Sequence, residues 1–593
     1  MAEPRQARVR APELRGRGWL NTGGRALTLP DLRGKIVVLD FWTFCCINCL
    51  HVLDELHPLE EKYGDVLVVI GVHSPKFEHE RDPDALAAAV ERYSVRHPVL
   101  DDADMTMWQQ YAAKAWPTLA VIDQTGYLVA SMAGEGHAEG LSRLIDELIA
   151  RGGLRHGDAP YVPSVPADTL LRFPGKAIEL ASGNLLVSDS ARHSLAELAP
   201  DGETLIRRIE GDLNEPQGLL LLPAKIAEVA GYDVVVADTV NHRLRGLKLD
   251  TGELTTVAGS GRPWRSTVDG HAHDALAADL SSPWDLAWYD DKVIIAMAGI
   301  HQLWWFDPVR RTVGVYAGTT VESLRDGPLP DVWMAQPSGL SADGGTLWIA
   351  DSETSAVRWI ENGVMHTAVG QGLFDFGHVD GPAQAALLQH PLGVAALPDG
   401  DVLIADTYNG AIRRFQPATR TVSTVDSGFA EPSDILVTST GAVFVVESGA
   451  HRLTRLAPGT INPGAVQTVT GARHRTERPP STVGAGEVTL DVIFTPAPGQ
   501  QLDETYGPAT RLEISASPPE LLVEGAGVTT DLSRRLVLAE GRGVLQVVAQ
   551  AATCDADVEH AACHLTRQDW GVPIIVAPAG PDRLPLVLRG LDA

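Results

Sequence analysis

Three cysteines lie close together near the beginning of the chain, in the segment CCINC. Cys45, Cys46 and Cys49 directly follow an apolar run of strand length at residues 35–41 (KIVVLDF), and leucines recur every three residues from position 50 to 59, which predicts a helix. A thiolate at a helix N-terminus faces unpaired N–H groups and the positive end of the helix dipole, both of which stabilise it. A second cysteine three residues on can then attack a mixed disulfide. A CxxC pair between a strand and a helix therefore predicts thiol–disulfide exchange.

The elements around the cysteines predict a small α/β domain over residues 14–152. Apolar runs and helical periodicity place three further strands and two further helices there, at 65–73, 119–123 and 127–133 and at 83–93 and 140–150. The order strand, helix, strand, helix, hairpin, helix is typical of a sheet with helices on both faces. The cysteines then lie where a buried strand ends and a helix begins.

The segment DFWTFCCINC at residues 40–49 resembles the active-site segment of thioredoxins. The resemblance implies a thioredoxin-like fold in which Cys46 is the attacking thiol and Cys49 the resolving thiol. It also implies that Asp40, six residues before the first cysteine of the CxxC pair, accepts the proton of Cys49.

The segment WPT at residues 116–118 resembles the cis-proline segment that lies against the cysteines in thioredoxins. A cis bond before Pro117 is plausible because its cost for an X–Pro bond is only about 1 kcal/mol. The resemblance implies that Pro117 holds the backbone of the partner. It implies a substrate-binding role for the neighbouring residues Trp42, Trp116 and Thr118.

The motif departs from thioredoxins at two places. The dipeptide between the cysteines is Ile47-Asn48, so no reduction potential carries over. Cys45 stands where thioredoxins usually have a second tryptophan, and it can share a helix face with Cys49. A three-thiol relay, a Cys45–Cys49 disulfide and a small buried cysteine without a redox role all stay open. Metal binding by the three cysteines with His51 is disfavoured because the ligands would crowd one helical turn, and we expect no metal and no cofactor.

Between residues 160 and 473 the sequence repeats a unit of short strands. Each unit has an apolar strand that ends in a polar turn, as in VVVADTVNHRL (residues 234–244) and VLIADTYNGAI (402–412). The six turn positions are Asp189, Asp238, Met297, Asp351, Asp406 and Glu447. Successive turn positions are separated by 49, 59, 54, 55 and 41 residues. Four strands at such a period predict a six-bladed β-propeller. We interpret its turn aspartates as acceptors for nearby donors rather than as metal ligands.

Residues 487–593 have short strand patterns without a repeat, which predicts a C-terminal β-sandwich. Cys554 and Cys563 lie nine residues apart across a predicted hairpin. In a reducing compartment two free thiols are the default expectation. The alternative is an auxiliary pair of thiols that exchanges electrons with Cys46 and Cys49.

Over nearly its whole length the chain resembles the NHL repeat-containing protein 2 family, which joins a thioredoxin-like domain, a six-bladed NHL propeller and a C-terminal β-domain. The segments that carry the resemblance are FWTFCCINCLH (41–51), GVHSPKFEHE (71–80), AWPTL (115–119), GEGH (134–137) and VADTVNHRLR (236–245). The resemblance implies a redox-like module joined to a scaffold, and it names no substrate.

Three classes of function fit these features. The first, which we favour, is a thiol–disulfide oxidoreductase that recognises a protein or peptide partner through a propeller face and the redox cleft. The second is a thiol peroxidase, because Thr43-x-x-Cys46 matches the Thr-x-x-Cys of peroxiredoxins, although Leu39 stands where their proline is expected. The third is a non-catalytic protein-interaction scaffold in which the thioredoxin-like module no longer turns over.

The composition bears on partners and compartment. The 593 residues are 44% hydrophobic and 21% charged, which is ordinary for packed domains, and the net charge of −28 disfavours nucleic acid and anionic lipid as partners. Residues 1–17 lack the apolar core of a signal peptide, and no run reaches the length of a membrane span. Five cysteines are few for a secreted disulfide framework. We therefore expect a soluble, cytoplasmic monomer.

Overall fold

The computed structural model describes residues 9–163, 168–264, 272–461, 469–475, 480–494, 496, 500–502, 508–555 and 563–588. The chain forms two compact units. The first joins the N-terminal region to the region from Glu477 onward, and the second spans Pro166–Thr476 together with the short segment Phe77–His79. Among the described residues, no helix combines the length and the apolar character needed to cross a membrane.

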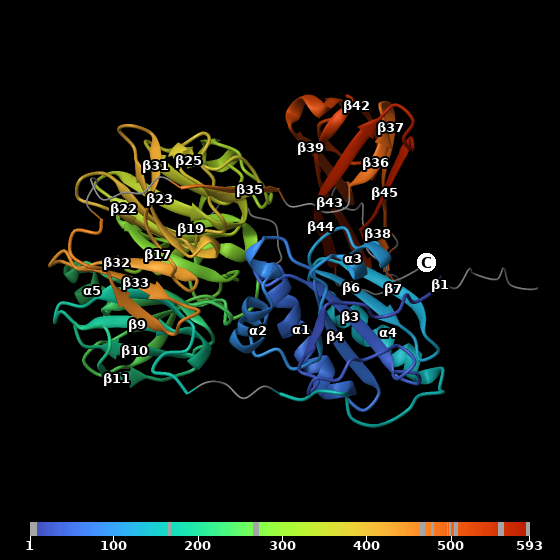
Figure 1. The fold of residues 1–593 in the computed structure, drawn as a ribbon, viewed down its shortest axis with the longest axis horizontal. Coiled ribbons are helices and arrows are strands. Elements are labelled where there is room, and N and C mark those ends of the chain that lie inside the picture. Colours follow the sequence, from blue (N-terminus) through green and yellow to red (C-terminus); the bar gives the residue numbers. More distant parts are fainter. Residues whose placement is uncertain are drawn as a thin grey trace, which may run out of the picture. The chain divides into compact units, whose positions relative to one another are not determined.

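The N-terminal part of the first unit is built on a mixed seven-stranded sheet of order β1-β7-β6-β3-β4-β5-β2 (Figure 1). Its central strand β3 (Ile36–Trp42) is buried along its whole length and runs parallel to β4 (Leu67–His73). Burial on both faces explains why residues 35–41 form a nearly continuous apolar run. The other strands are β1 (Val9–Arg10), β2 (Gly18–Leu20), β5 (Val99–Asp101), β6 (Thr118–Ile122) and β7 (Tyr127–Ala133).

Helices cover both faces of this sheet. On one face, α1 (Ile47–Tyr63) and α4 (Ala138–Ala150) pack against the side chains of Ile36 and Val38. Because side chains alternate along a strand, the side chain of Asp40 points to this same face. The opposite face carries α3 (Thr106–Gln110), and the remaining helix is α2 (Pro83–Arg92). The predicted thioredoxin-like fold is confirmed.

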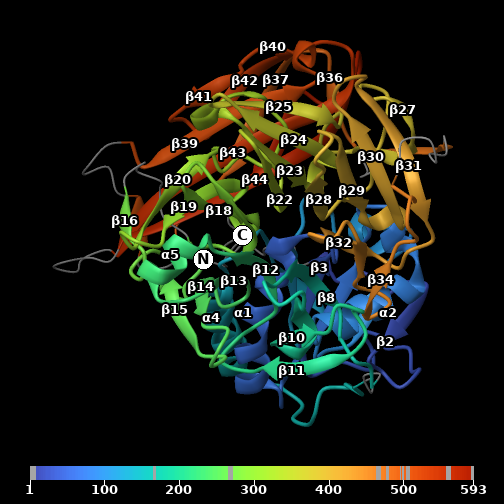
Figure 2. The same cartoon turned by 90° about the vertical axis from the view of Figure 1, so that its left-hand side faces the viewer.

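The second unit contains six consecutive antiparallel sheets in its described residues, and they follow one another around a ring (Figure 2). The first blade consists of β8 (Pro174–Glu179), β9 (Leu185–Asp189), β10 (Ser194–Leu198) and β11 (Leu205–Ile209). The second blade consists of β12 (Pro216–Leu221), β13 (Val234–Asp238), β14 (Arg243–Leu247) and β15 (Leu254–Ala258). The third blade consists of β16 (His273–Asp274), β17 (Pro283–Tyr289), β18 (Lys292–Met297), β19 (Gln302–Asp307) and β20 (Thr312–Ala317). The fourth blade consists of β21 (Gly327–Pro328), β22 (Pro337–Asp343), β23 (Thr346–Asp351), β24 (Ala356–Glu361) and β25 (Val364–Val369).

The fifth and sixth blades complete the ring. The fifth blade consists of β27 (Gly381–Pro382), β28 (Gly393–Ala396), β29 (Val402–Asp406), β30 (Ala411–Gln416) and β31 (Thr421–Ser427). The sixth blade consists of β32 (Pro432–Val437), β33 (Val443–Glu447) and β34 (Arg452–Arg455). A short helix, α5 (Ala224–Ala230), and a two-stranded sheet of β26 (Asp375–Val379) and β35 (Thr470–Arg475) are added to the blades. The predicted six-bladed propeller is confirmed.

A buried charged cluster links three blades. The ammonium group of Lys176 on β8 lies 3.2 Å from a carboxylate oxygen of Asp285 on β17 and 3.6 Å from one of Asp434 on β32. It also donates a hydrogen bond to the carbonyl of Leu392 at 2.8 Å. Since β8, β17 and β32 are the first strands of the first, third and sixth blades, Lys176 ties distant parts of the ring together.

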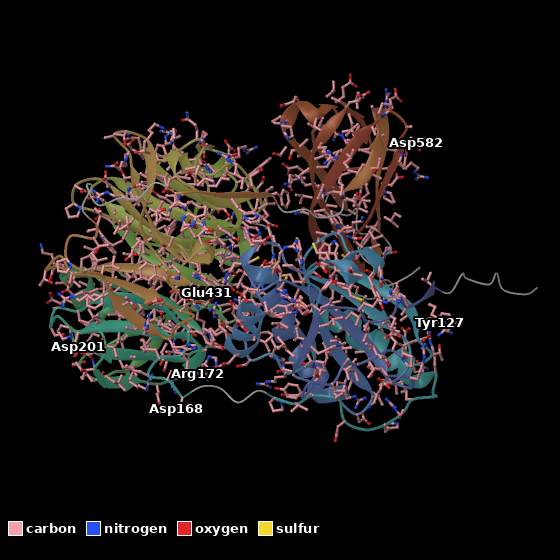
Figure 3. All side chains as sticks on the ribbon, viewed as in Figure 1. Tyr127, Asp168, Arg172, Asp201, Glu431 and Asp582 are labelled. Atoms are coloured by element: carbon pink, nitrogen blue, oxygen red, sulfur yellow. The ribbon has the colours of Figure 1, made fainter. Side chains whose placement is uncertain are left out.

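The turn aspartates of the propeller accept hydrogen bonds from their neighbours. The N–H of Arg172, which Figure 3 labels, donates to Asp189 at 2.5 Å. Asp351 accepts from the N–H of Ala335 at 2.7 Å and from the guanidinium of Arg358 at 3.2 Å. Within the described part of the chain, no cluster of side chains suited to a metal ion occurs. These contacts agree with the structural interpretation of the aspartates.

The C-terminal part of the first unit is a β-sandwich, as predicted. One sheet has the order β36-β44-β43-β39-β41 with β38 paired to β43, and the other has the order β40-β42-β37-β45. They share an apolar core that includes Leu490, Leu512 and Trp570. The strands are β36 (Ser481–Gly484), β37 (Gly486–Ile493), β38 (Gln500–Leu502), β39 (Thr510–Ser517), β40 (Leu522–Glu524), β41 (Gly527–Thr529), β42 (Ser533–Leu538), β43 (Gly541–Asp555), β44 (Cys563–Ala577) and β45 (Arg583–Val587).

Candidate active site

The turn between β3 and α1 holds Cys45, Cys46 and Cys49 as free thiols. Cys46 caps the N-terminus of α1, because its carbonyl accepts hydrogen bonds from the N–H groups of Cys49 at 3.0 Å and Leu50 at 3.3 Å. Cys46 is partly exposed, whereas Cys45 and Cys49 are buried. The structure therefore brings one accessible and one shielded thiol together at a helix start, which is the arrangement that thiol–disulfide exchange needs.

The Cys49 thiol is held in its protonated form. Burial raises the pKa of Cys49 well above its ordinary value, and the neighbouring sulfur of Cys46, which shares a hydrogen bond with it, raises that pKa further. The charge of Asp40 acts in the same direction. Cys49 thus needs a proton acceptor before its sulfur can attack a disulfide.

Asp40 is a buried carboxyl close to Cys49. It is completely buried, and neither of its carboxyl oxygens has a hydrogen-bond partner among the described residues. Burial, followed by the nearby charge of Glu60, raises the pKa of Asp40 to about 8. A carboxyl with such a pKa can both take up and return a proton near neutral pH, as a general acid–base group must.

Trp42 forms part of a buried wall next to the cysteine turn. Its side chain is fully buried, and its ring meets the imidazole of His73 edge-on at 5.3 Å, while Phe44 stacks on the other side of His73 at 5.3 Å. Burial, with the charge of Arg17 second, lowers the pKa of His73 to about 3, so its imidazole is neutral. In this structure the side chain of Trp42, for which a substrate-binding role was predicted, exposes no surface to a substrate.

The cis-proline segment follows the expected geometry. The Trp116–Pro117 bond is cis. Thr118 pairs with Phe41 across β6 and β3, so Pro117 lies beside the point where β3 enters the cysteine turn. The carbonyl of Pro117 accepts a hydrogen bond from the N–H of Gly134 at 2.9 Å.

Side chains next to Pro117 are held by the protein itself. The indole N–H of Trp116 donates to the carbonyl of Ser74 at 2.9 Å, and the hydroxyl of Thr118 donates to the carbonyl of Ala115 at 2.7 Å. Trp116 is partly exposed, whereas Thr118 is buried. Of the three residues expected to bind substrate, Trp116 alone keeps exposed surface, and Thr118 serves to shape the cis-proline turn.

The C-terminal sandwich contributes to the same neighbourhood within the first unit. Ala115 belongs to the apolar core of the sandwich. A Cβ atom placed on Gly134 would lie 2.3 Å from the amide oxygen of Gln568 on β44. The two loops on either side of Pro117 therefore pack against the C-terminal domain, a relationship that the sequence did not signal.

A carboxylate that the sequence did not single out holds the backbone of the cysteine turn. Glu80 is buried, and its two carboxylate oxygens accept hydrogen bonds from the N–H groups of Cys45 at 3.0 Å and Lys76 at 2.8 Å. The sulfur of Cys45 lies 4.0 Å from the hydroxyl of Thr43. Because Cys45 and Cys49 are both free thiols here, the Cys45–Cys49 disulfide is not formed in this structure.

A second support lies along α1. The imidazole Nδ1 of His51 lies 2.6 Å from a carboxylate oxygen of Glu135, and Glu55 accepts hydrogen bonds from the N–H groups of Gly136 and His137. These contacts attach the GEGH segment to the helix that begins at Cys46. His51 therefore attaches this loop to α1 through its contact with Glu135.

Cys554 is disulfide-bonded, which corrects the default expectation of a free thiol at this position. In the pairing of β43 with β44 its register partner is Cys563, whose side chain lies outside the described residues.

Comparison with known proteins agrees with the fold and the site. Residues 34–128 match the family described as Thioredoxin-like, and residues 388–415 match the NHL repeat. Over 141 residues, the chain is 28% identical to Thiol-disulfide oxidoreductase YkuV of Bacillus subtilis, which covers 23% of this chain and 93% of that protein. The N-terminal domain is therefore related to thiol–disulfide oxidoreductases.

Two longer relatives match more of the chain. Protein SUPPRESSOR OF QUENCHING 1, chloroplastic, of Arabidopsis thaliana is 35% identical over 502 residues, which are 75% of this chain and 46% of that protein, so the chain spans about half its length. NHL repeat-containing protein 2 of Gallus gallus is 35% identical over 522 residues, which are 76% of this chain and 70% of that protein. With the thioredoxin-like domain and the propeller both in place, the chain belongs to the NHL repeat-containing protein 2 family.

Proposed function

We propose that this chain is a thiol–disulfide oxidoreductase that acts through its CCINC motif. The observation that carries the proposal is a partly exposed Cys46 at the start of α1, hydrogen-bonded to a buried Cys49, with the buried carboxyl of Asp40 close by. These groups are a nucleophile, a resolving thiol and a proton acceptor, which are the parts that exchange requires.

The reaction begins when the thiolate of Cys46 attacks one sulfur of a substrate disulfide. A mixed disulfide forms, and the other substrate sulfur leaves as a thiolate that takes up a proton from water. Asp40, as a carboxylate, then removes the proton of Cys49, whose sulfur attacks Cys46. The Cys46–Cys49 disulfide forms, the second substrate sulfur leaves, and two electrons have passed from the dithiol to the substrate. Run in reverse, the same steps oxidise a substrate dithiol.

Pro117 and the exposed part of Trp116 are the surfaces proposed to hold the substrate backbone. Pro117 lies beside the cysteine turn, and the indole of Trp116 is fixed by its bond to Ser74 and by contact with Trp108 at 4.4 Å. A rigid aromatic edge next to the reactive sulfur suits an extended peptide better than a small metabolite. The propeller adds a second proposed surface for recognition of a protein or peptide partner.

We carry forward three further expectations as parts of this proposal: a monomer, a cytoplasmic location, and partners that are neither nucleic acid nor membrane. The acidic net charge of −28 supports the last of these. The name of one relative includes the word chloroplastic, which describes that relative. Fractionation of the native host cells with an antibody to this chain tests its location.

The test of activity compares insulin reduction by dithiothreitol with and without the full chain. We expect the wild type to accelerate insulin precipitation, Cys46→Ser to abolish the effect, and Cys49→Ser to accumulate a mixed disulfide. Cys45→Ser is the matched control, and its loss of activity would instead indicate a three-thiol relay. Peroxide consumption in place of insulin reduction would make the chain a thiol peroxidase. Activity in neither assay would overturn the proposal and favour a scaffold.

A further inference from the structure

Asp40 lies beside a strand position that has no side chain of its own. In the parallel pairing of β3 with β4, Asp40 is the register partner of Gly71. Three other side chains reach this position, because a Cβ atom placed on Gly71 would lie 2.9 Å from Nε1 of Trp42, 3.2 Å from Nε2 of His97 and 3.4 Å from a methyl group of Val99. Neighbouring strands are about 4.8 Å apart. Nε2 of His97 is thus close to the strand position next to Asp40, on the face of the sheet to which the Asp40 carboxyl points.

The other nitrogen of His97 points to a second carboxylate. Nδ1 of His97 lies 3.2 Å from a carboxylate oxygen of Glu60 on α1. The side chain of His97 is almost completely buried, whereas that of Glu60 is 20% exposed. One imidazole thus lies between a buried carboxyl and a carboxylate that reaches solvent.

Several polar atoms of Asp40, Glu60 and His97 lack hydrogen-bond partners among the described residues. Among the described residues, neither oxygen of Asp40, Oε2 of Glu60 nor Nε2 of His97 has a hydrogen bond. Buried polar atoms are seldom left unpaired, and when they cluster they hold water. We call these atoms, together with Nε1 of Trp42, which also has no hydrogen bond among the described residues, the polar channel.

Other titratable and charged groups lie near Glu60. His57 on α1 and Tyr161 both interact electrostatically with Glu60 and with Arg96, and His57 also interacts with His97. Arg96 also lies 3.6 Å from the exposed carboxylate of Glu61. Asp40, in turn, acts electrostatically on Cys49. The channel therefore connects a carboxyl that acts on the resolving thiol with a carboxylate that keeps some exposed surface.

We propose that His97 and Glu60 form the path by which Asp40 returns to solvent the proton that it takes from Cys49. This inference rests on the proposed thiol–disulfide exchange. After Asp40 has accepted the Cys49 proton, that proton passes through one water molecule to Nε2 of His97. The proton on Nδ1 moves to Glu60 and from there to bulk water. No electron moves in this relay, and Asp40 is again a carboxylate for the next turnover.

The experiment follows the two halves of one turnover with a small disulfide, 5,5′-dithiobis(2-nitrobenzoate), by stopped flow on the full chain. Attack by Cys46 releases a first thionitrobenzoate, and attack by Cys49 releases a second. We expect Glu60→Gln and His97→Gln to leave the first release unchanged and to slow the second by about tenfold or more, the size expected for a lost general acid–base path. The matched controls are Glu61→Gln and His156→Gln, whose side chains are 76% and 71% exposed, and both are expected to match the wild type.

Chemical rescue separates a proton path from a merely structural role. Added imidazole is expected to restore the second release in His97→Gly, and the solvent deuterium isotope effect on that release is expected to grow in both channel variants. A wild-type rate of second release in Glu60→Gln and His97→Gln would overturn the relay while exchange stands. A slowed release that imidazole does not restore, with an unchanged isotope effect, would overturn it as well. Loss of the first release in the wild type would instead overturn the proposed exchange, and the relay with it.

Discussion

The N–H of Cys45 donates a hydrogen bond to the buried carboxylate of Glu80, 35 residues further along the chain, at 3.0 Å. The second oxygen of the same carboxylate accepts the N–H of Lys76 at 2.8 Å. The shape of the cysteine turn thus depends on a residue outside the active-site segment. A carboxylate that accepts two backbone N–H groups away from water makes strong, charge-assisted bonds.

Removal of the Glu80 carboxylate is therefore expected to loosen the cysteine turn. Glu80→Ala removes the acceptor of two buried N–H groups and should lower the free energy of unfolding by about 2–6 kcal/mol, since loss of the partner of a buried group costs about 1–3 kcal/mol. Glu80→Gln keeps one acceptor and should cost less. Urea unfolding measures both, with Glu139→Ala as the exposed control. Equal stability of Glu80→Ala and wild type would contradict this role of Glu80.

Replacement of Asp40 by Asn is expected to stabilise the fold and to slow exchange. The folded pKa of about 8 lies above the ordinary value of 3.8, so the folded chain keeps a proton that the unfolded chain releases. This contribution is complete below pH 3.8 and is lost as the pH rises toward 8. By pH 7, Asp40→Asn should gain about 4 kcal/mol over wild type, and near pH 4 almost nothing.

The measurement for Asp40→Asn is urea unfolding between pH 4 and 8, together with the rate of mixed-disulfide resolution. That rate should fall by about tenfold or more, because the proton acceptor of Cys49 is gone. A stability difference that does not change with pH would show that Asp40 titrates normally in the folded chain.

Gly71→Ala is expected to disturb the channel. The added methyl group would lie 2.9 Å from Nε1 of Trp42 and 3.2 Å from Nε2 of His97, both in buried side chains. Overpacking of this kind costs about 1–3 kcal/mol. Thermal unfolding measures the loss, and Gly18→Ala, which meets no atom within 4 Å, is the matched control. Unchanged stability and unchanged second thiol release in Gly71→Ala would show that the space beside Asp40 is not filled by His97.

Lys176→Ala is expected to destabilise the propeller. The change leaves the carboxylates of Asp285 and Asp434 buried without their shared cation, and loss of one member of a buried charged group costs about 3–5 kcal/mol. The unfolding transition of the propeller, followed by tryptophan fluorescence, reports this loss. Lys225→Ala, on an exposed turn of α5, should behave like wild type. An unchanged unfolding transition in Lys176→Ala would show that the buried charged cluster does not stabilise the propeller.

Local patterns predicted much of the fold and the core of the site. The strand before CCINC and the leucines after it define β3 and α1, because burial of a central strand and of one helix face leaves periodic apolar residues. The repeated turns of the propeller can be recognised in the sequence for the same reason, since each blade buries its apolar strands in a similar way. Asp40, Cys46, Cys49 and Pro117 were found because they lie in or beside these short, recognisable segments.

Other features were decided by the tertiary structure. Trp42 was expected at the substrate, but the alternation of β3 buries it under α1. Glu80 meets Cys45, and Gln568 meets Gly134, across separations that no local pattern spans. The sequence by itself determined that a CxxC pair lies between a strand and a helix, because that signal depends on residue type and short-range spacing, and the resemblance to thioredoxins pointed to Asp40. Only the tertiary structure brings His97 beside Glu60 and beside the Gly71 position next to Asp40, because the register of β3 with β4 and the packing of α1 bring together residues that are distant along the chain.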